Sequence, residues 1–369
     1  MHNTGNRSVS EGKGDLDPGE NQGSSPMVRT AGISYARREW RGDPMKAVIQ
    51  DRYGSADALE FRDVDRPVPA ADEVLVRVHA ASVNAYDWHL MHGDPVIGRT
   101  MMGLRRPKAP VRGRDFAGVV ETVGPEVTGL KPGDEVYGEA DGAFAEYVCA
   151  RDGEVGPKPA NLTFEQAAAI PLAGNTALIG LRDVARVRAG QTLLVNGASG
   201  GVGTFAVQLG KAYGAEVTAV CSTRNVELVR SLGADRVVDY KQEDFTRDGK
   251  RYDVVLDLVG NRSLAEFRSV LTPTGTLVLS GGGVYEGGSV VGPMGLFMKR
   301  RLVAPFARHQ RLLEISARQT RANLAALREL AESGKITPVV ERTYPLSEAA
   351  EAIRYLEVEH ARAKVVVTV

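Results

Sequence analysis

The chain has few cysteines and no long apolar run. Its 369 residues include two cysteines, Cys149 and Cys221, which cannot form a disulfide framework or a four-cysteine zinc site. Such a low count is typical of a reducing compartment, and we expect the cytoplasm. No apolar run approaches the roughly 18 residues of a membrane-spanning helix, and the first residues lack the apolar core of a secretory signal peptide. The sequence therefore predicts neither a secreted nor a membrane-spanning protein.

An excess of charge of either sign is also missing. The 46 Lys and Arg residues balance the 46 Asp and Glu residues. Nucleic acids and anionic membranes favour basic surfaces, so we expect neither as the main partner. A hydrophobic content of 43% and a charged content of 25% are ordinary for a globular protein, and the length suffices for about two domains.

Residues 1–44 lack the apolar periodicity of folded elements. They are rich in Gly, Ser, Asn and charged residues and cannot bury a core, so we predict a disordered tail. Met45 begins a strand-like segment and is a candidate native start, which mass spectrometry of the native N-terminus would test.

The pattern of the remaining chain changes near residue 165. Residues 45–165 are β-rich, with turns between expected strands at Lys46–Gln50, Ala58–Val64, Glu73–Val83, Ala117–Val123 and Phe144–Ala150. From 166 to 308, strands alternate with helices, which predicts a doubly wound parallel sheet and an α/β fold. The expected strands are Thr192–Asn196, Glu216–Cys221, Arg236–Asp239, Asp253–Asp257 and Thr276–Ser280, and the expected helices are Gly203–Tyr213, Val226–Leu232 and Ser263–Leu271. Residues 309–369 predict helices at Asn323–Ser333 and Ser347–Glu357 and a closing strand at Lys364–Val369.

The most informative segment is Thr192–Lys211, TLLVNGASGGVGTFAVQLGK. A buried strand is followed by a glycine-rich turn and then by a helical pattern. Glycines between a strand and a helix let the backbone approach a phosphate, and the first helical N–H groups hold the anion. We therefore predict a dinucleotide site whose turn comprises Ala198, Ser199, Gly200, Gly201, Val202 and Gly203.

The end of the next expected strand favours NADPH over NADH. In this fold an acidic residue there bonds the 2′-hydroxyl of the adenosine ribose, whereas a basic group accommodates a 2′-phosphate. Here the strand ends at Ser222 and Arg224, with no acid at its tip. Arg224 offers a fork-shaped donor for a phosphate, although a solvated charge at a helix start is the alternative.

Together these residues resemble the medium-chain dehydrogenase/reductase superfamily, and within it the zinc-independent quinone oxidoreductases related to zeta-crystallin. The matching positions are Gly190-Gln191, Leu194, Ala198–Gly201, Gly203, Gln208 and Lys211, with further matches at Val83–Trp88, Arg114–Val120, Lys131–Val136, Gly142–Val148 and Pro171–Ala177. The resemblance implies a GroES-like catalytic domain (45–165), a Rossmann nucleotide-binding domain (166–308) and a return of residues 309–369 to the catalytic domain. It also implies a homodimer formed through the nucleotide-binding domains.

Two positions argue against zinc. Zinc alcohol dehydrogenases of the superfamily have a cysteine where this chain has Asn84, and a histidine where it has Arg114. Asn is a poor zinc ligand and Arg is not one at neutral pH. His89 and His92 are spaced i, i+3 without a nearby thiolate, so we predict no metal site.

Without a metal, the acceptor must be polarised by hydrogen bonds or be already activated. A hydride can reach a quinone or the β-carbon of an α,β-unsaturated carbonyl, and preorganised donors would stabilise the negative charge that develops. The resemblance places Asn84 near the nicotinamide and the substrate, and Tyr86 and His89 follow as candidate donors. A packed aromatic role for Tyr86, and an orienting or helix-capping role for Asp87, remain open.

The resemblance implies further cofactor contacts. Thr176 lies in the segment that approaches the cofactor in related proteins, and Tyr240 takes the position that borders the 2′-phosphate. Asn225 replaces a lysine that is common in this branch, and Arg224 is its candidate substitute. Val259, Ser280 and Gly281 follow the fourth and fifth strands, at carboxyl ends where this fold binds its ligand.

Two questions stay open at this level. The stretch Pro293–Phe306, with the basic cluster Lys299–Arg301, is either an apolar substrate lid or a helix with a solvated basic edge. The function that we expect is that of an NADPH-dependent reductase of quinones or activated alkenes. The two alternatives are an enoyl-thioester reductase and a non-catalytic NADPH-binding protein like the lens crystallins.

Overall fold

The computed structural model describes residues 40–281, 294–307, 309–359 and 361–369, all within one unit, Arg37–Val369. The first described element is strand β1 (Trp40–Gln50), which pairs antiparallel with β2 (Leu59–Pro67). The prediction of a tail up to residue 44 is therefore wrong for residues 40–44, and the rest of the tail lies outside the described residues. The register shifts between Trp40 and Pro44, and β1 accommodates Gly42 at this irregularity.

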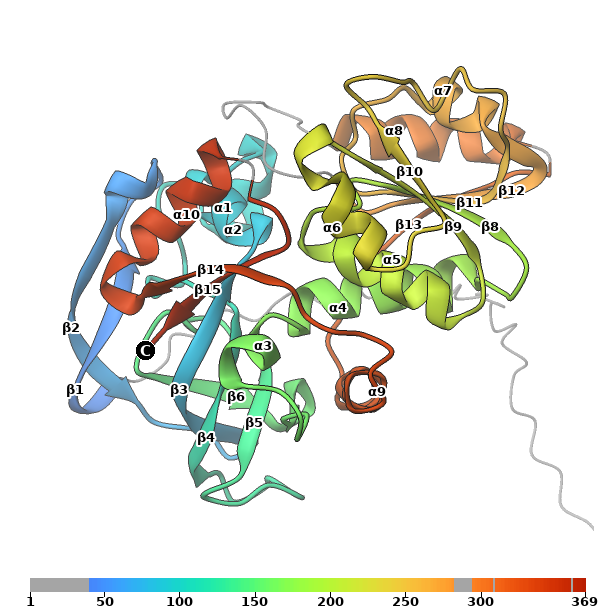
Figure 1. Cartoon of the computed structure of the whole chain (residues 1–369). Coiled ribbons are helices and arrows are strands. Elements are labelled where there is room, and N and C mark those ends of the chain that lie inside the picture. Colours follow the sequence, from blue (N-terminus) through green and yellow to red (C-terminus); the bar gives the residue numbers. More distant parts are fainter. Residues whose placement is uncertain (1–39, 282–293, 308, 360) are drawn as a thin grey trace, which may run out of the picture. The chain divides into compact units, whose positions relative to one another are not determined.

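Six parallel strands form the sheet predicted from the alternating pattern, which confirms the α/β class (Figure 1). In spatial order they are β10 (Arg236–Asp239), β9 (Glu216–Cys221), β8 (Thr192–Asn196), β11 (Tyr252–Asp257), β12 (Leu271–Leu279) and β13 (Arg311–Glu314). Their helices are α5 (Gly201–Ala212), α6 (Val226–Ser231), α7 (Leu264–Ser269) and α8 (Met294–Val303). Because β13 pairs with β12, the sheet extends beyond the expected limit at residue 308.

Both faces of this sheet are buried, as the continuous apolar runs predict. Leu193 and Val195 of β8 join a core cluster that contains Phe205 of α5, whereas Leu194 joins another with Phe267 of α7. The alternation follows the two-residue period of a strand, which places helices on both sides.

A second sheet of seven strands contains residues from both ends of the described chain. Its order is β14 (Val340–Pro345), β15 (Lys364–Thr368), β3 (Glu73–Val83), β4 (Asp115–Val123), β5 (Glu135–Glu139) and β7 (Val155–Pro157), with β6 (Tyr147–Arg151) paired to β3. Strand β15 pairs antiparallel with β3, so that Val365 lies opposite Val83. After the parallel sheet, the chain therefore returns to the sheet that contains β3, and β14 and β15 complete the GroES-like domain.

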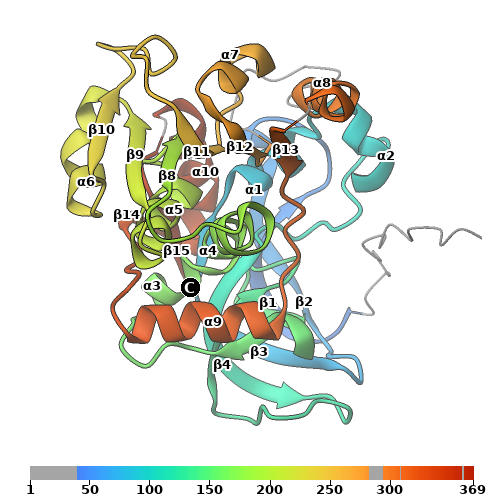
Figure 2. The same ribbon diagram turned by 90° about the vertical axis from the view of Figure 1, so that its right-hand side faces the viewer.

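The remaining helices connect or cover these sheets. They are α1 (Ala85–His92), α2 (Arg99–Met102), α3 (Phe164–Ala168), α4 (Pro171–Leu178), the π-helical η4 (Ile179–Ala185), α9 (Arg321–Glu332) and α10 (Ala349–Val358). Short 3-10 turns lie at Ala56–Ala58, Val96–Gly98, Asp152–Glu154, Thr223–Asn225, Ala304–Phe306 and Leu346–Glu348. Helix α9 packs on α4 (Figure 2), where a side chain at Gly174 would meet Leu327 at 3.3 Å.

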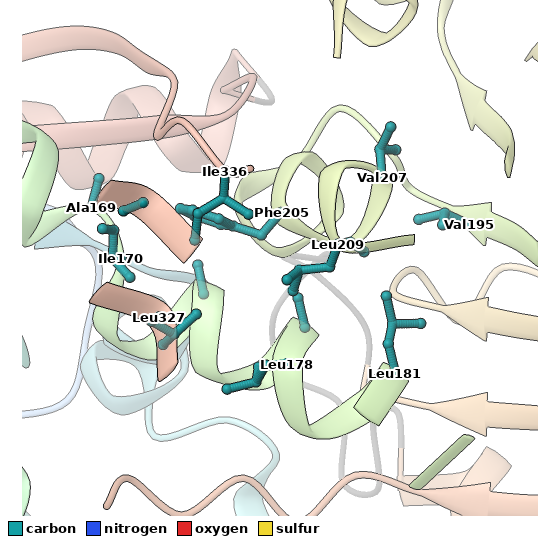
Figure 3. Close-up of a cluster of buried hydrophobic side chains, with 14 of the residues drawn as sticks. Ala169, Ile170, Leu178, Leu181, Val195, Phe205, Val207, Leu209, Leu327 and Ile336 are labelled. Carbon is teal, nitrogen blue, oxygen red and sulfur yellow. The ribbon is translucent and has the colours of Figure 1, made fainter. Parts of the chain in front are cut away.

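The buried cluster around α4 and α5 joins segments that are distant in sequence (Figure 3). It includes Ala169, Ile170, Leu178, Leu181, Val195, Phe205, Val207, Leu209, Leu327 and Ile336. Burying a Leu, Ile or Phe side chain contributes about 1.5–3 kcal/mol. This cluster therefore holds α5 and α9 against α4.

Candidate active site

The glycine turn between β8 and α5 is fixed by its backbone. Gly197 has a φ of +90°, and a Cβ there would meet Val259 Cγ2 at 2.7 Å. A Cβ on Gly203 would lie 2.2 Å from the Gly197 carbonyl oxygen. The first N–H groups of α5 have no acceptors within the helix by its geometry, so Gly201–Gly203 present donors and the positive end of the dipole, whereas the Gly200 N–H donates to the Gly197 carbonyl at 3.2 Å. The turn fits the pyrophosphate of a dinucleotide.

The end of β9 lies against this turn. The Asn225 side chain donates from Nδ2 to the hydroxyl of Ser199 at 3.0 Å and to that of Ser222 at 3.2 Å. Tyr240 lies beside the same strand end, because its N–H donates to the Cys221 carbonyl at 3.1 Å, and it is 50% exposed. Arg224 is exposed and donates to the Glu359 carbonyl at 2.6 Å. The structure therefore brings Ser199, Ser222, Arg224 and Tyr240 to one edge.

A carboxylate that the sequence did not reveal also lies at this edge. Asp239 of β10 is opposite Cys221 in the parallel register. Its oxygens accept from the Thr223 hydroxyl at 2.6 Å, the Gln242 amide at 2.8 Å and the Lys241 N–H at 3.0 Å. The Thr223 hydrogen bond and the other two donors hold the pKa of Asp239 below its ordinary value. Three protein donors bond this carboxylate, and it ends β10, whereas the acid of an NAD site follows the second strand, here β9.

The other predicted cofactor residues lie on neighbouring elements. Val259 follows β11, where its N–H donates to the Asp257 carboxylate at 3.2 Å, and Ser280 donates its N–H to the Asp257 carbonyl at 3.0 Å. Gly281 follows with a φ of +107°. Thr176 is on α4, which contacts α5, and its hydroxyl donates to the Leu172 carbonyl at 2.7 Å.

Asn84 stands at the start of α1 in a buried polar cluster. Its Nδ2 donates to Asp115 Oδ2 at 3.0 Å and to the Ser82 carbonyl at 3.3 Å. Its Oδ1 accepts from Lys364 Nζ at 2.5 Å. Both ends of the amide are therefore engaged within the protein, which suits an orienting role better than direct donation to a substrate.

The sequence reasoning missed Lys364 and the importance of Asp115. Asp115 accepts from the Ser82 hydroxyl at 3.0 Å and from the Leu172 N–H at 3.1 Å, and Lys364 Nζ lies 3.5 Å from its Oδ2. Burial lowers the pKa of Lys364. A lysine that directly precedes the apolar run Val365–Val367 in the closing strand was the one signal available, because a charge at such a place needs a buried partner.

Asp87 caps the first turn of α1 rather than lying free. Its Oδ2 accepts from the Asn84 N–H at 2.8 Å, and it is fully buried. Burial, with a smaller contribution from the neighbouring Asp115 carboxylate, raises the pKa of Asp87 to about 7 against the lowering effect of the Asn84 hydrogen bond. The capping interpretation left open by the sequence is the one that the geometry supports.

Tyr86 and His89, the two candidate donors, lie on α1 and are half-buried. The Arg114 guanidinium lies 5.3 Å from the centre of the Tyr86 ring. His89 Nδ1 lies 3.1 Å from the Asp94 carbonyl, which only accepts, so in the neutral ring Nδ1 carries the proton and Nε2 is an acceptor. Burial lowers the pKa of His89. Tyr86 is therefore the better proton donor near neutral pH.

The residues at the zinc-ligand positions do not fit a metal. Arg114 donates to Glu139 at 2.9 Å and to Asp141 at 3.0 Å; although burial disfavours its charge, these carboxylates hold the pKa of Arg114 above its ordinary value. At Asn84 the nearest group is the Lys364 ammonium. An amide bound to an ammonium and a guanidinium bound to two carboxylates therefore stand where zinc enzymes have ligands. Within the described residues, no group of three or more His, Cys, Asp and Glu side chains is placed to hold a metal ion.

Helix α8 covers most of the stretch predicted as a lid or helix, whose first residue, Pro293, lies outside the described residues. Leu296, Phe297 and Val303 pack on the core of the parallel sheet. In the basic cluster, Arg300 and Arg301 pair with Glu314 of β13 at 2.8 and 3.1 Å. These contacts favour the interpretation as a helix with a basic edge.

A cavity of about 410 Å³ lies at the C-terminal end of α1. It is lined in part by Arg52, Tyr53, His92, Asp94, Arg99 and Arg105. None of the predicted site residues lines it. In the part of the chain that the structure describes, no helix has both the length and the apolar character to span a membrane.

Comparison with known proteins places the chain among oxidoreductases. Residues 70–160 match the alcohol dehydrogenase GroES-like domain, and residues 232–367 match the family described as zinc-binding dehydrogenase. The human mitochondrial NAD(P)H oxidoreductase RTN4IP1 is 36% identical over 368 residues, covering 89% of this chain and 90% of the relative. The chloroplastic NADPH-dependent alkenal/one oxidoreductase of Arabidopsis thaliana is 36% identical over 340 residues, covering 88% and 79%. The quinone oxidoreductase from Coxiella burnetii superposes with a TM-score of 0.76 at 31% identity, covering 89% of this chain and all of that one.

These names contradict the expected cytoplasmic location. The human relative is mitochondrial and the Arabidopsis relative is chloroplastic. The cysteine count that suggested the cytoplasm separates reducing from oxidising compartments, but it does not separate one reducing compartment from another.

Proposed function

Because the chain belongs to the medium-chain dehydrogenase/reductase superfamily, in its zinc-independent quinone oxidoreductase branch, we propose that it is an NADPH-dependent reductase of quinones or α,β-unsaturated carbonyls. The arrangement at the carboxyl edge of β8 and β9 carries the proposal. The glycine turn there meets a strand end with Ser222 and Arg224, and the Asp239 carboxylate beside it is already occupied. Two relatives are named as an NADPH-dependent alkenal/one oxidoreductase and as a quinone oxidoreductase.

The chain offers a contact for each part of the cofactor. The N–H groups of Ser199 and Gly201–Gly203 would hold the pyrophosphate at the N-terminus of α5. Ala198 and Gly200, whose N–H groups donate to the Val220 and Gly197 carbonyls, would shape the turn. Ser222, Arg224 and Tyr240 would surround the 2′-phosphate, while Thr176, Val259, Ser280 and Gly281 would border the rest. The bound nicotinamide would supply the hydride.

The residues at the start of α1 would serve the acceptor. Tyr86 would donate a hydrogen bond to the carbonyl or quinone oxygen as negative charge develops there, and would deliver the proton. Asn84, held by Lys364 and Asp115, would keep this segment in place, and His89 would line the acceptor site. Because Asn84 and Arg114 stand at the zinc-ligand positions, hydrogen bonds would polarise the carbonyl or quinone oxygen of the acceptor.

A panel of acceptors tests the function. NADPH oxidation is measured with quinones, enals, enones and enoyl thioesters, and the dissociation constants of NADPH and NADH are compared by fluorescence. We expect turnover with quinones or enones and tighter binding of NADPH. Tighter NADH binding would contradict the cofactor assignment, and tight NADPH binding without turnover would indicate a non-catalytic binding protein. Preferred turnover of enoyl thioesters would favour an enoyl-thioester reductase. The structure gives that alternative no support from the basic cluster, because Arg300 and Arg301 are paired with Glu314.

The proposed oligomer is a homodimer formed through the nucleotide-binding domains. Strand β13 lies at an edge of the six-stranded sheet, and the neighbouring segment exposes Met298 and Leu302 of α8 and Phe306 of the 3-10 turn that follows. Met298 and Leu302 are four residues apart and share one face of α8. Light scattering after size-exclusion chromatography tests this, and a monomer at micromolar concentration would contradict it. The balanced charge supports a small-molecule partner rather than nucleic acid or a membrane surface.

A further inference from the structure

Lys364 is a charged side chain in an almost entirely closed environment. It is the first residue of β15 and only 2% exposed. Its ammonium lies 2.5 Å from Asn84 Oδ1 and 3.5 Å from Asp115 Oδ2. Burying an ammonium is costly unless it is hydrogen-bonded and paired with an opposite charge. Its partners belong to α1 and β4, so this one side chain ties the closing strand to the segment that starts α1.

The same stretch of chain contacts the glycine turn. The Ala363 N–H donates to the Ser199 carbonyl at 2.7 Å, and Ala363 forms a parallel bridge with Gly200. A Cβ on Gly201 would lie 3.1 Å from Lys364 Cδ. Ala363 therefore contacts the glycine turn through its backbone, and the aliphatic part of Lys364 lies beside the same turn. The ammonium of Lys364 contacts Asn84 at the start of α1.

The ammonium also decides which way the Asn84 amide faces. In the observed orientation, Oδ1 faces Lys364 and Nδ2 donates to Asp115 and to the Ser82 carbonyl. A flipped amide would direct its NH2 group at the ammonium and its oxygen at a carboxylate, which loses three hydrogen bonds and adds two repulsions. Lys364 and Asp115 together thus select one orientation.

We propose that Lys364 is a positioning residue for the hydride transfer, acting through Asn84 and the glycine turn. The inference rests on the proposed function, because it assigns the residue that keeps the cofactor turn and the acceptor segment in register. If Lys364 served only as the counter-ion of Asp115, its ammonium would lie closer to the carboxylate than to the amide. Instead, Nζ is 1 Å closer to Asn84 Oδ1 than to Asp115 Oδ2.

A double-mutant cycle between Lys364 and Asn84 tests the proposal. Lys364→Met, Asn84→Ala and the double variant are compared with Lys250→Met, an exposed lysine, as the control. We expect each single variant of the pair to lower kcat by about tenfold to a hundredfold, the scale of a misplacement of about 1 Å. The double variant should lose about as much kcat as the more damaging single variant, because both changes remove one interaction. NADPH affinity should change by less than about threefold, and Lys364→Arg, which keeps the charge, should recover part of kcat.

Multiplying kcat losses would overturn the proposal, and so would a loss of NADPH affinity at unchanged kcat, which would make Lys364 a cofactor contact. If Lys364→Met does not fold, the variant that combines Lys364→Met with Asp115→Asn replaces it in the cycle, because the second change removes the uncompensated buried carboxylate. Asp115→Asn alone is then the reference in place of wild type.

A readout without turnover separates this inference from the proposed function. Hydrogen exchange is measured in the nucleotide-free protein, for peptides that cover Ser199–Gly203 and Ala363–Val367. We expect faster exchange of both peptides in Lys364→Met and no change in Lys250→Met. If wild type shows no turnover with any acceptor, the proposed function fails while this readout still applies. Unchanged exchange in Lys364→Met would overturn the positioning role.

Discussion

Replacing Asp87 with Asn should remove a pH-dependent loss of stability. The Asp87 carboxyl is fully buried at the start of α1, near Asp115, Lys364 and Arg112. Burial raises its pKa from an ordinary value of 3.8 to about 7. A folded-state pKa above the unfolded value means that the native protein binds this proton more tightly. The resulting stability is fully present below about pH 4 and is lost as the pH rises to about 7.

The magnitude follows from the shift. Three pKa units at about 1.36 kcal/mol each correspond to about 4 kcal/mol of unfolding free energy between pH 4 and pH 7. In Asp87→Asn the side-chain oxygen still accepts from the Asn84 N–H, so the cap is kept while the titration is removed.

Urea unfolding at several pH values between 4 and 7 measures the difference. Relative to Asp87→Asn, wild type should become less stable by about 4 kcal/mol across this range. Asp57→Asn, at an exposed carboxylate, serves as the matched control and should follow wild type. Parallel curves for wild type and Asp87→Asn would refute the reasoning, because they would show that Asp87 titrates alike in both states.

Three further substitutions test other parts of the molecule. Gly203→Ala should weaken NADPH and NADH alike and cost about 1–3 kcal/mol of unfolding free energy, because its Cβ would lie 2.2 Å from the Gly197 carbonyl; unchanged fluorescence titrations would contradict the turn geometry. Arg224→Ala should raise the NADPH dissociation constant about tenfold, the scale of one charged hydrogen bond, and leave NADH within about twofold; equal losses would point to a structural role. Tyr137→Phe leaves the Leu324 carbonyl without the Tyr137 hydroxyl at 2.7 Å, so thermal unfolding should show a loss of about 1–3 kcal/mol; a change in kcat at full folding would contradict a purely structural role.

The parallel sheet was accessible from sequence because its strands are continuous apolar runs between turn residues. The predicted limits of β8, β9 and β10 agree with the structure. Helix α4 was not predicted, since Pro171–Leu178 consists largely of small residues without a helical apolar period. Its helical form depends on packing against α5 and α9. Strand β13 was missed for a similar reason, because four residues are too few for a pattern.

By itself, the sequence determined the class of fold, the glycine-rich turn between β8 and α5, and the absence of zinc ligands at two positions. These follow from residue types and local periodicity, which act over a few neighbouring residues. Only the tertiary structure decided that Asn84 is held at both ends and that Asp239 is occupied. It also decided that Lys364 reaches a residue 280 positions away. Such contacts depend on strand pairing between distant segments. A buried charge is stabilised by its partners, so its role can be inferred only when those partners are known.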